Sequence, residues 1–243
     1  NKNSIILNPG KDLISPGQIY IPGDISSAAF FMVLGAIIPG ARIIIEGVSL
    51  NPARCGIINV LRRMRAKIKV FPLKCKKAQG FEPMGNLRIS ASRLKSTVVN
   101  PGEVPSLIDE LPVLMVAACF AQGRTIIKSA GELRVKETDR INSMVTNLKR
   151  MGADIRVVKS GRGENIVVKG QERLRGARLK SFGDHRTAMS MVVAALAAEG
   201  ASRIDDVSCI SKSFPGFLAT LNSLKNKGDK NKGDGSLKRT VPF

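Results

Sequence analysis

The sequence is built from a pattern that repeats almost three times between Gln18 and Leu224. Each copy holds a short strand-like run, an apolar helix, a second strand and an amphipathic helix, and the first two copies add a closing strand pair. The apolar helices are expected to begin near Asp24, Asp109 and Asp184, which lie 85 and 75 residues apart. A helix that is apolar nearly all round is buried on all sides. The pattern therefore predicts an α/β (α+β) fold of three β-α-β-α-β-β units around three buried helices.

The expected element boundaries follow from the changes in hydrophobic period. In the first copy we expect strands at 18–22, 41–46, 67–71 and 87–91, and helices at 28–38 and from 51 onward. In the second copy we expect strands at 96–99, 125–128, 154–159 and 165–169, and helices at 104–122 and 135–151. In the third copy we expect strands at 177–182 and 202–207 and helices at 187–198 and up to about 224, with no closing pair.

One turn departs from the repeat. Arg65 in the segment RMRAKI stands where the second copy has Gly152 in RMGADI. Glycine at such a position ends a helix in the left-handed conformation at no steric cost. We therefore expect the left-handed cap to be lost at Arg65.

The ends of the chain differ in composition from its repeats. Residues 1–17 are rich in turns and are interpreted as a connector, or as the end of a domain that precedes them. Residues 226–243 are rich in Lys, Gly and Asp and are predicted to be a disordered basic tail. The four cysteines are widely spaced and form no CxxC pair, which favours free thiols over a disulfide framework or a metal site. We expect a cytoplasmic protein, because the sequence shows neither a long apolar run nor a signal segment.

The net charge of +20 raises the hypothesis of a nucleic-acid-binding module. The cations are spread along the whole chain, and no aromatic residues are interleaved with them to stack on bases. A basic cleft for a phosphorylated small molecule would explain part of the excess but not all of it. We expect neither nucleic acid nor a membrane among the partners.

The segment GELRVKETDR, residues 131–140, carries the densest cluster of chemically useful groups. Lys136, Glu137 and Arg140 precede an amphipathic run, which predicts that they lie in the first turns of a helix with a buried face. Side chains three and four apart are neighbours there, and the helix start favours anions. The cluster could hold an anionic substrate and hand it a proton. The alternative is a solvated first turn with ion pairs between Glu137 and its basic neighbours.

Several motifs together resemble the C-terminal half of the 5-enolpyruvylshikimate-3-phosphate (EPSP) synthase family. They occur in the family's order and cover nearly all of residues 18–225: Pro22 to Ala29 (PGDISSAA), Leu50 to Arg54 (LNPAR), Ile108 to Pro112 (IDELP), Arg134 to Arg140 (RVKETDR), Gly183 to Arg186 (GDHR) and Ser211 to Pro215 (SKSFP). The resemblance implies one domain of a two-domain fold. Each domain has three β-α-β-α-β-β units around parallel buried helices, and the active site lies between the domains.

The same resemblance implies a reaction and a set of site residues. The enolpyruvyl group of phosphoenolpyruvate would pass to the 5-hydroxyl of shikimate 3-phosphate with release of phosphate, and no metal or organic cofactor is implied. The resemblance makes Asp109 the base near the attacking hydroxyl and Glu137 the acid and base at C3 of phosphoenolpyruvate. The remaining residues implied are Lys136 beside the shikimate part, and Arg140, Arg186, Lys212 and His185 beside phosphoenolpyruvate.

Each of these residues also has a structural interpretation. Asp109 could only cap its helix, as Asp24 and Asp184 are expected to do. His185 could be a structural residue at a helix start, and Lys212 a surface lysine. Arg54 could equally be structural at the start of its helix.

The other half of the family's chain has no counterpart in residues 1–17, so the chain alone is predicted to be inactive or nearly so. The missing N-terminal domain is then a partner, and the joined protein is expected to be a monomer. Two alternatives stay open. One is the related transferase that acts on UDP-N-acetylglucosamine, and the other is the nucleic-acid-binding module.

Overall fold

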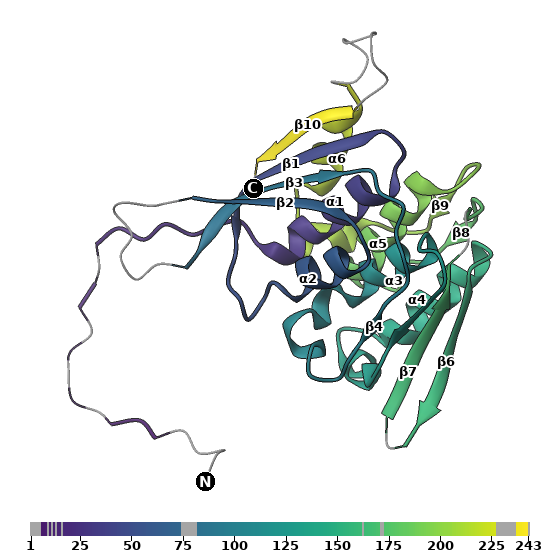
Figure 1. The fold of residues 1–243 in the computed structure, drawn as a ribbon, viewed down its shortest axis with the longest axis horizontal. Coiled ribbons are helices and arrows are strands. Elements are labelled where there is room, and N and C mark those ends of the chain that lie inside the picture. Colours follow the sequence, from purple (N-terminus) through teal and green to yellow (C-terminus); the bar gives the residue numbers. More distant parts are fainter. Residues whose placement is uncertain are drawn as a thin grey trace.

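Small sheets surround three buried helices in the computed structural model of the chain (Figure 1). The structure describes residues 6–8, 10, 12, 14–15, 17–73, 82–161, 163–170, 173–226 and 237–242. Its elements follow the predicted repeat of three copies.

The first copy forms a helix, a long strand, a second helix and a closing strand pair. Its elements are α1 (Ile25–Ile37), β1 (Ala41–Ser49), α2 (Gly56–Arg63), β2 (Lys67–Pro72) and β3 (Met84–Ser90). The second copy has the same order with three added 3-10 helices. Its elements are β4 (Val98–Val99), η1 (Val104–Ser106), η2 (Ile108–Glu110), α3 (Leu111–Cys119), β5 (Arg124–Ile127), η3 (Ala130–Val135), α4 (Arg140–Arg150), β6 (Asp154–Ser160) and β7 (Gly163–Lys169).

The third copy is shorter and is followed by one more strand. Its elements are β8 (Arg178–Leu179), α5 (His185–Ala197), β9 (Arg203–Ile204), η4 (Ser208–Lys212) and α6 (Phe217–Asn226), and the chain then forms β10 (Leu237–Pro242). The predicted fold class and the predicted order of the buried helices are confirmed.

The sheets show the same repeat in their strand order. The first sheet has the order β10-β1-β3-β2, the second β4-β5-β7-β6, and the third contains β8 and β9. In each sheet the outermost strand at one edge runs parallel to its neighbour, whereas β3 and β7 run antiparallel to both of theirs. The antiparallel pairing of β6 with β7 fits the short connection between Ser160 and Gly163.

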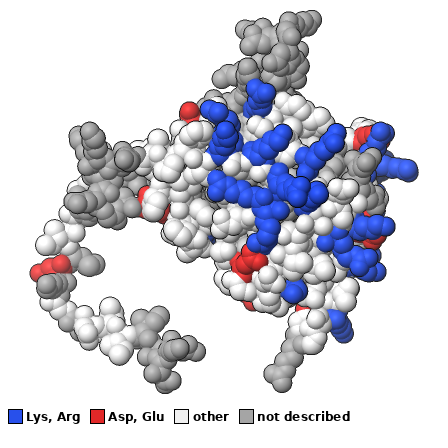
Figure 2. Space-filling view, in the orientation of Figure 1, with Lys and Arg blue, Asp and Glu red and all other residues white. Residues whose placement is uncertain are grey.

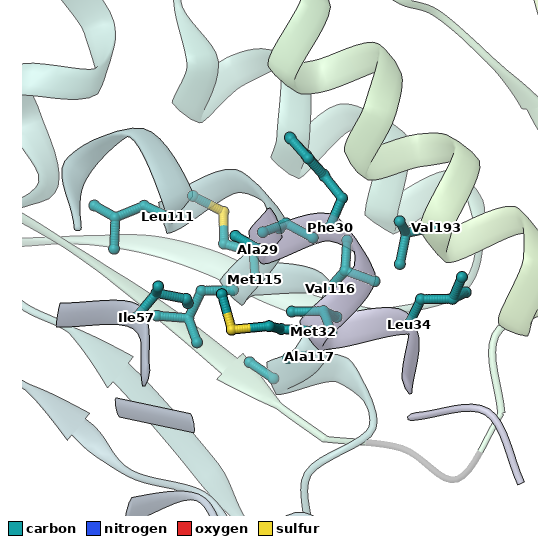
Figure 3. Close-up of a cluster of buried hydrophobic side chains, with 14 of the residues drawn as sticks. Ala29, Phe30, Met32, Leu34, Ile57, Leu111, Met115, Val116, Ala117 and Val193 are labelled. Carbon is teal, nitrogen blue, oxygen red and sulfur yellow. The ribbon is translucent and has the colours of Figure 1, made fainter. Parts of the chain in front are cut away.

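The core lies where α1, α3 and α5 pack against one another. Every residue of α3 is buried, and α1 is buried along nearly its whole length. Figure 3 shows side chains of α1, among them Phe30 and Met32, beside Met115 and Val116 of α3 and Val193 of α5. This packing explains why the three helices carry almost no charge between their ends.

The buried helices also begin at the same end of the molecule. The Ser26 hydroxyl, in the first turn of α1, donates a hydrogen bond to Glu110, directly before α3. Arg186, in the first turn of α5, lies 3.6 Å from the carboxylate of Asp109. Helix starts that touch in this way place the three helices parallel, as the family resemblance implies.

The predicted helix at 104–122 is wrong in its first half. The structure has the two 3-10 helices η1 and η2 there, and the regular helix α3 begins only at Leu111. Prolines explain the difference. Pro105 and Pro112 lack an N–H, so each fits the first turn of a helix but not the interior of one long helix.

The prediction for the turn at Arg65 is also wrong. Arg65 keeps the left-handed conformation with φ of 68°, and Gly152 has φ of 87° in the same place of the second copy. The two turns close with the same bond. Ala66 N–H donates to the carbonyl of Leu61 at 2.9 Å, and Ala153 N–H donates to that of Leu148 at 2.9 Å. The surrounding turn therefore holds a non-glycine residue in a conformation that costs free energy.

Two predictions at the ends of the repeat region need correction. Residues 18–22 do not form the predicted strand; only Gly23 makes an isolated parallel bridge, to Val48. The tail is not disordered throughout, because the backbone of β10 pairs with β1. Residues 227–236 and 243 of the predicted tail lie outside the described residues.

The described cysteines Cys55, Cys119 and Cys209 are free thiols, and Cys75 lies outside the described residues. Within the described ranges, no helix is both long and apolar enough to cross a membrane. No set of three or more His, Cys, Asp and Glu side chains in the described part of the chain could hold a metal ion.

Candidate functional site

The site lies at the starts of the buried helices, where side chains from all three copies meet. Its centre is the guanidinium of Arg140, which is only 1% exposed. Its Nε donates to Asp184 at 2.7 Å, its Nη1 donates to Asp109 at 3.2 Å, and its Nη2 donates to Glu137. A buried charge is stable only when it is paired and hydrogen-bonded, and here three carboxylates satisfy one guanidinium.

Asp184 links this guanidinium to the start of α5. Its side chain is fully buried and accepts hydrogen bonds from the backbone N–H groups of Arg186 and Thr187. Burial acts to raise the pKa of Asp184, but the bonds from Arg140 and from the backbone outweigh it, so the pKa lies below its ordinary value. The prediction that Asp184 caps its helix is confirmed, and so is the one for Asp24, whose carboxylate accepts from the N–H groups of Ser26 and Ser27.

Asp109 occupies a different position from these two caps. It lies in η2, and its side chain makes no capping bond to η2 or to α3. Its carboxylate instead faces Arg140 at 3.2 Å, Arg186 at 3.6 Å and Arg54 at 4.0 Å, and it stays 24% exposed. Arg186 also donates to the backbone carbonyl of Asp109 at 3.3 Å. The alternative that Asp109 is only a helix cap is therefore wrong.

The prediction that Lys136 and Glu137 lie in the first turn of a helix is wrong as well. Residues 130–135 form η3, Lys136 is extended, and α4 begins only at Arg140. Asp139 explains this start, because its carboxylate accepts from the N–H of Asn142 at 2.9 Å and so caps α4. The predicted convergence is nevertheless found in part, since Glu137 reaches Arg140 from the bend before the helix.

The remaining predicted residues lie at the rim of this cluster. Glu137 is 54% exposed and Lys136 is half-buried without an ion pair among the described residues. His185 is the first residue of α5, and burial, followed by the charge of Arg186, lowers its pKa, so the ring is neutral near pH 7. Lys212 is exposed at the end of η4, which packs against α5, and no described contact joins it to Asp109, Glu137 or Arg140.

Glu110 is a site residue that the sequence interpretation missed. Its side chain is 1% exposed, accepts a hydrogen bond from Ser26, and lies 3.8 Å from Arg54. Arg54 also donates to the Ser26 hydroxyl at 2.9 Å, so it joins the first copy to the second. Burial raises the pKa of Glu110 against the opposing effect of its bond from Ser26. A carboxylate directly before an all-apolar helix is the signal in the sequence that could have identified it.

Taken together, the cluster sets three arginines against four carboxylates. The arginines are Arg54, Arg140 and Arg186, and the carboxylates are those of Asp109, Glu110, Glu137 and Asp184. Guanidinium groups bind carboxylate and phosphate with two parallel hydrogen bonds. A substrate with both groups could therefore replace exposed carboxylates such as Glu137 on these arginines.

A second charged surface lies away from this site. Arg42, Lys67, Lys69 and Arg88 line a shallow depression of about 950 Å³ on the outer face of the first sheet. Figure 2 shows Lys and Arg side chains gathered across the middle of this face of the molecule. The guanidinium of Arg88 lies 5.1 Å from the ring centre of Phe71, which is the geometry of a cation–π contact.

The fold is that of an enolpyruvyl transferase domain. The enolpyruvyl transferase NikO from Streptomyces tendae superposes on 83% of this chain with a TM-score of 0.63, at 17% identity and over 42% of its own chain. The EPSP synthase from Acinetobacter baumannii superposes more closely, with a TM-score of 0.75 and 38% identity over 84% of this chain and 46% of its own.

The sequence comparisons identify the family. The model of EPSP synthase (3-phosphoshikimate 1-carboxyvinyltransferase) matches residues 1–221, and this chain belongs to that family. The 3-phosphoshikimate 1-carboxyvinyltransferase of Geotalea uraniireducens (strain Rf4) is 48% identical over 207 residues, which are 85% of this chain and 47% of the relative. That of Syntrophomonas wolfei subsp. wolfei is 47% identical over 225 residues, 92% of this chain and 51% of the relative. The chain thus spans about half the length of the curated relatives it matches.

Proposed function

We propose that this chain supplies half of the active site that transfers the enolpyruvyl group of phosphoenolpyruvate to the 5-hydroxyl of shikimate 3-phosphate and releases phosphate. This step belongs to the shikimate pathway, which leads to chorismate and the aromatic amino acids. The observation that carries the proposal is the chain of ion pairs that joins Asp109, Glu137, Arg140 and Arg186 at the helix starts. Asp109, Glu137 and Arg140 come from the second copy and Arg186 from the third, and all four belong to the family's motifs.

The geometry supports a distinct role for each acid. Asp109 is held by arginines but keeps an exposed side, so it can accept the proton of an attacking hydroxyl. Glu137 lies at the outer rim, where it can deliver a proton to C3 of phosphoenolpyruvate once the substrate has replaced it on Arg140. The two carboxylates bind different nitrogens of one guanidinium, which keeps them close together.

The cations would hold the two anionic substrates. Arg140 and Arg186 would bind the carboxylate and phosphate of phosphoenolpyruvate, and Lys212 would complete that site if η4 lies over the bound substrate. Lys136, which has no described ion pair, would bind shikimate 3-phosphate. His185 lies beside Arg186 and would contact the same ligand in its neutral form.

The rest of the substrate site would come from the half of the relatives that this chain does not match. We propose that the chain works joined to that half as a cytoplasmic monomer, without a metal or organic cofactor. This chain supplies the cluster at the helix starts, and it spans only 47% of the Geotalea relative. The chain alone is therefore expected to be inactive or nearly so.

The test is turnover after mixing this chain with the matching first half of the Geotalea relative. We expect phosphate release that depends on both phosphoenolpyruvate and shikimate 3-phosphate. Asp109→Asn and Glu137→Gln should each reduce it by about 10²- to 10⁴-fold, the usual contribution of a general acid or base. Arg63→Met, at an exposed ion pair with Glu103, serves as the matched control and should leave the rate unchanged.

Two results would contradict the proposal. A folded mixture that gives no turnover with shikimate 3-phosphate but releases phosphate with UDP-N-acetylglucosamine would favour the related transferase. Binding to mixed-sequence DNA that weakens steeply with salt, without any response to shikimate 3-phosphate, would favour a nucleic-acid-binding function. The family membership does not favour these alternatives.

A further inference from the structure

The parallel outer strand of the first sheet comes from an unexpected part of the chain. In the second and third sheets the outer strands β4 and β8 come from the segment that precedes the buried helix. In the first sheet that place beside β1 is taken by β10, from the other end of the chain. The segment that precedes α1, residues 18–22, lies outside any sheet.

The repeat predicts where residues 18–22 would pair. In the third sheet Arg178 pairs with Arg203, which lies three residues after Gly200, and in the second sheet Val98 pairs with the residue three after Gly123. Gly40 is the counterpart of these glycines, so the corresponding position of β1 is Ile43. Arg178 lies six residues before the helix cap Asp184, and six residues before the cap Asp24 is Gln18. The repeat therefore places Gln18 opposite Ile43.

An observed contact shows that this segment approaches the same edge of β1. Gly23 forms a parallel bridge with Val48, with N–H to carbonyl bonds of 2.8 Å to Gly47 and from Ser49. Because β1 is irregular between Ile45 and Val48, the bridge gives the direction and the edge of the pairing, and the register comes from the repeat. The structure thus holds the last contact of a strand whose remaining residues are undocked.

The undocked residues carry the side chains of a strand. Ile19 is 59% exposed, Tyr20 is 58% exposed and Ile21 is 83% exposed, and a run of large apolar residues is costly to leave in water. Figure 1 shows the purple N-terminal segment leading away from the molecule, whereas β10 lies along β1. Residues of β10 pair with Ala41 through Glu46, and Arg239 is the partner of Ile43. The same backbone groups of β1 cannot pair with both segments.

We propose that the outer edge of β1 is a strand-docking surface with two rival occupants from this chain, Gln18–Ile21 and β10. Strand addition uses main-chain hydrogen bonds, so two segments of different sequence can occupy one edge. An edge left without either would expose unpaired N–H and C=O groups. Docking of Gln18–Ile21 releases the tail, and docking of β10 releases the segment that leads into α1.

Replacement of one strand by the other matters for the candidate site because Gln18–Ile21 leads directly into residues that contact its arginines and carboxylates. The segment continues into Asp24, the cap of α1, and Ser26, which bonds to Glu110 and Arg54. Its occupancy of the edge would fix the path of the chain toward Asp24 and Ser26 from residue 18 onward. The tail strand would leave that path fixed only from Gly23.

Hydrogen exchange measured on the chain itself tests this proposal without any activity assay. In the full chain we expect the amides of residues 18–21 to exchange fast and those of β1 to be protected. In a chain that ends at Ser236, we expect exchange at 18–22 to slow by at least about tenfold, with β1 still protected, because the internal strand takes the edge. The variant Thr240→Pro, which removes one N–H from β10, should shift exchange in the same direction.

A second variant distinguishes replacement of one strand by the other from a general loss of stability at this edge. Ile19→Pro combined with Tyr20→Pro in the shortened chain should return the remaining amides of the segment, those of Gln18 and Ile21, to fast exchange. It should also remove protection from those amides of residues 41–46 that face this edge and not β3. Two results would overturn the proposal. One is that shortening the chain leaves 18–22 fast and deprotects β1, and the other is that 18–22 is already protected in the full chain.

Discussion

At the scale of single residues, the molecule depends most on Arg140. Its guanidinium is buried and holds carboxylates from three positions in the chain, one of which, Asp184, is itself fully buried. Such a cluster adds little net stability when it is complete, but removing its cation leaves the buried charge of Asp184 without a partner and out of reach of water. The effect of a substitution should therefore exceed that at any exposed ion pair.

We expect Arg140→Met to lower the free energy of unfolding by about 3–5 kcal/mol, because Asp184 keeps a buried charge without a partner. Urea denaturation measures this change in the free energy of unfolding. Arg63→Met is the control, since its pair with Glu103 is exposed and is worth at most about 1 kcal/mol. Adding Asp184→Asn to Arg140→Met should recover part of the loss. Equal losses at Arg140 and Arg63 would contradict this account of the cluster.

Replacing Arg65 in its strained turn with glycine is expected to raise the free energy of unfolding. A left-handed conformation costs a non-glycine residue about 1–2 kcal/mol, and glycine adds about 0.5–1 kcal/mol of entropy loss on folding. Arg65→Gly should therefore stabilise the chain by roughly 0.5–1 kcal/mol, read as a rise in the urea midpoint. Gly152→Ala, at the equivalent turn with φ of 87°, should destabilise it instead. A loss at both positions would show that Arg65 makes a compensating contact.

Acid should weaken the site through Asp184. Its pKa is lowered in the folded state, while the unfolded chain has an Asp pKa of about 3.9. The stability from this group is complete above about pH 4–5 and is lost as the pH falls below 3.9 toward the folded pKa. Asp184→Asn should be less stable at pH 7 and should lose less stability between pH 5 and pH 3, as measured by thermal unfolding. An unchanged acid slope in the variant would exclude Asp184 as the responsible group.

Which residues cap helices could be predicted from the sequence, but which carboxylates meet could not. Asp24 and Asp184 are recognisable from their position before an apolar run, which is a local property. Glu110 is not, because its partners, Ser26 and Arg54, are distant in sequence and lie in another copy. Such contacts depend on how the copies pack, and the hydrophobic period carries no information about that.

At the scale of helices and strands, the predicted type of each element agrees with the structure better than its predicted first residue does. The apolar pattern of α3 and the amphipathic pattern of α4 were correct, yet both helices begin later than expected. Pro112 near the start of α3 and Asp139 before α4 decide these starts, and each acts through one or two hydrogen bonds. The delayed start of α4 leaves Lys136 and Glu137 in a bend, from which Glu137 accepts a hydrogen bond from Arg140.

The cap of α4 should therefore affect both stability and the site. Asp139 accepts from Asn142 N–H at 2.9 Å and from Arg134 at 2.6 Å. Asp139→Ala should cost about 1 kcal/mol of unfolding free energy, whereas Asp139→Asn, which can still cap, should cost clearly less. The comparison is made by urea denaturation of the two variants. A similar loss in both would show that the ion pair with Arg134, and not the cap, fixes the start of α4.

At the scale of the whole molecule, the three copies share one core and cannot be independent units. Phe217 of α6, from the third copy, lies with its ring centre 5.6 Å from that of Phe31 and 5.8 Å from that of Phe30, both in α1. The repeat predicted that buried helices would meet, but it could not predict which end of the chain would complete each sheet. That choice depends on competition between segments for one edge, as at β1.

The shared core predicts how the molecule unfolds. Phe217 is fully buried, and Phe217→Ala should cost about 3–5 kcal/mol because it leaves a cavity between the first and third copies. Leu218→Ala, at the next residue with 40% of its surface exposed, should cost much less. Because α1, α3 and α5 pack together, Phe217→Ala should lower the urea concentration at the midpoint of unfolding by the same amount throughout the chain. Hydrogen exchange of amides in β1, β7 and α5, followed against urea concentration, gives the midpoint for each copy. If the probes in β7 kept the original midpoint, the second copy would unfold on its own and the single core would be disproved.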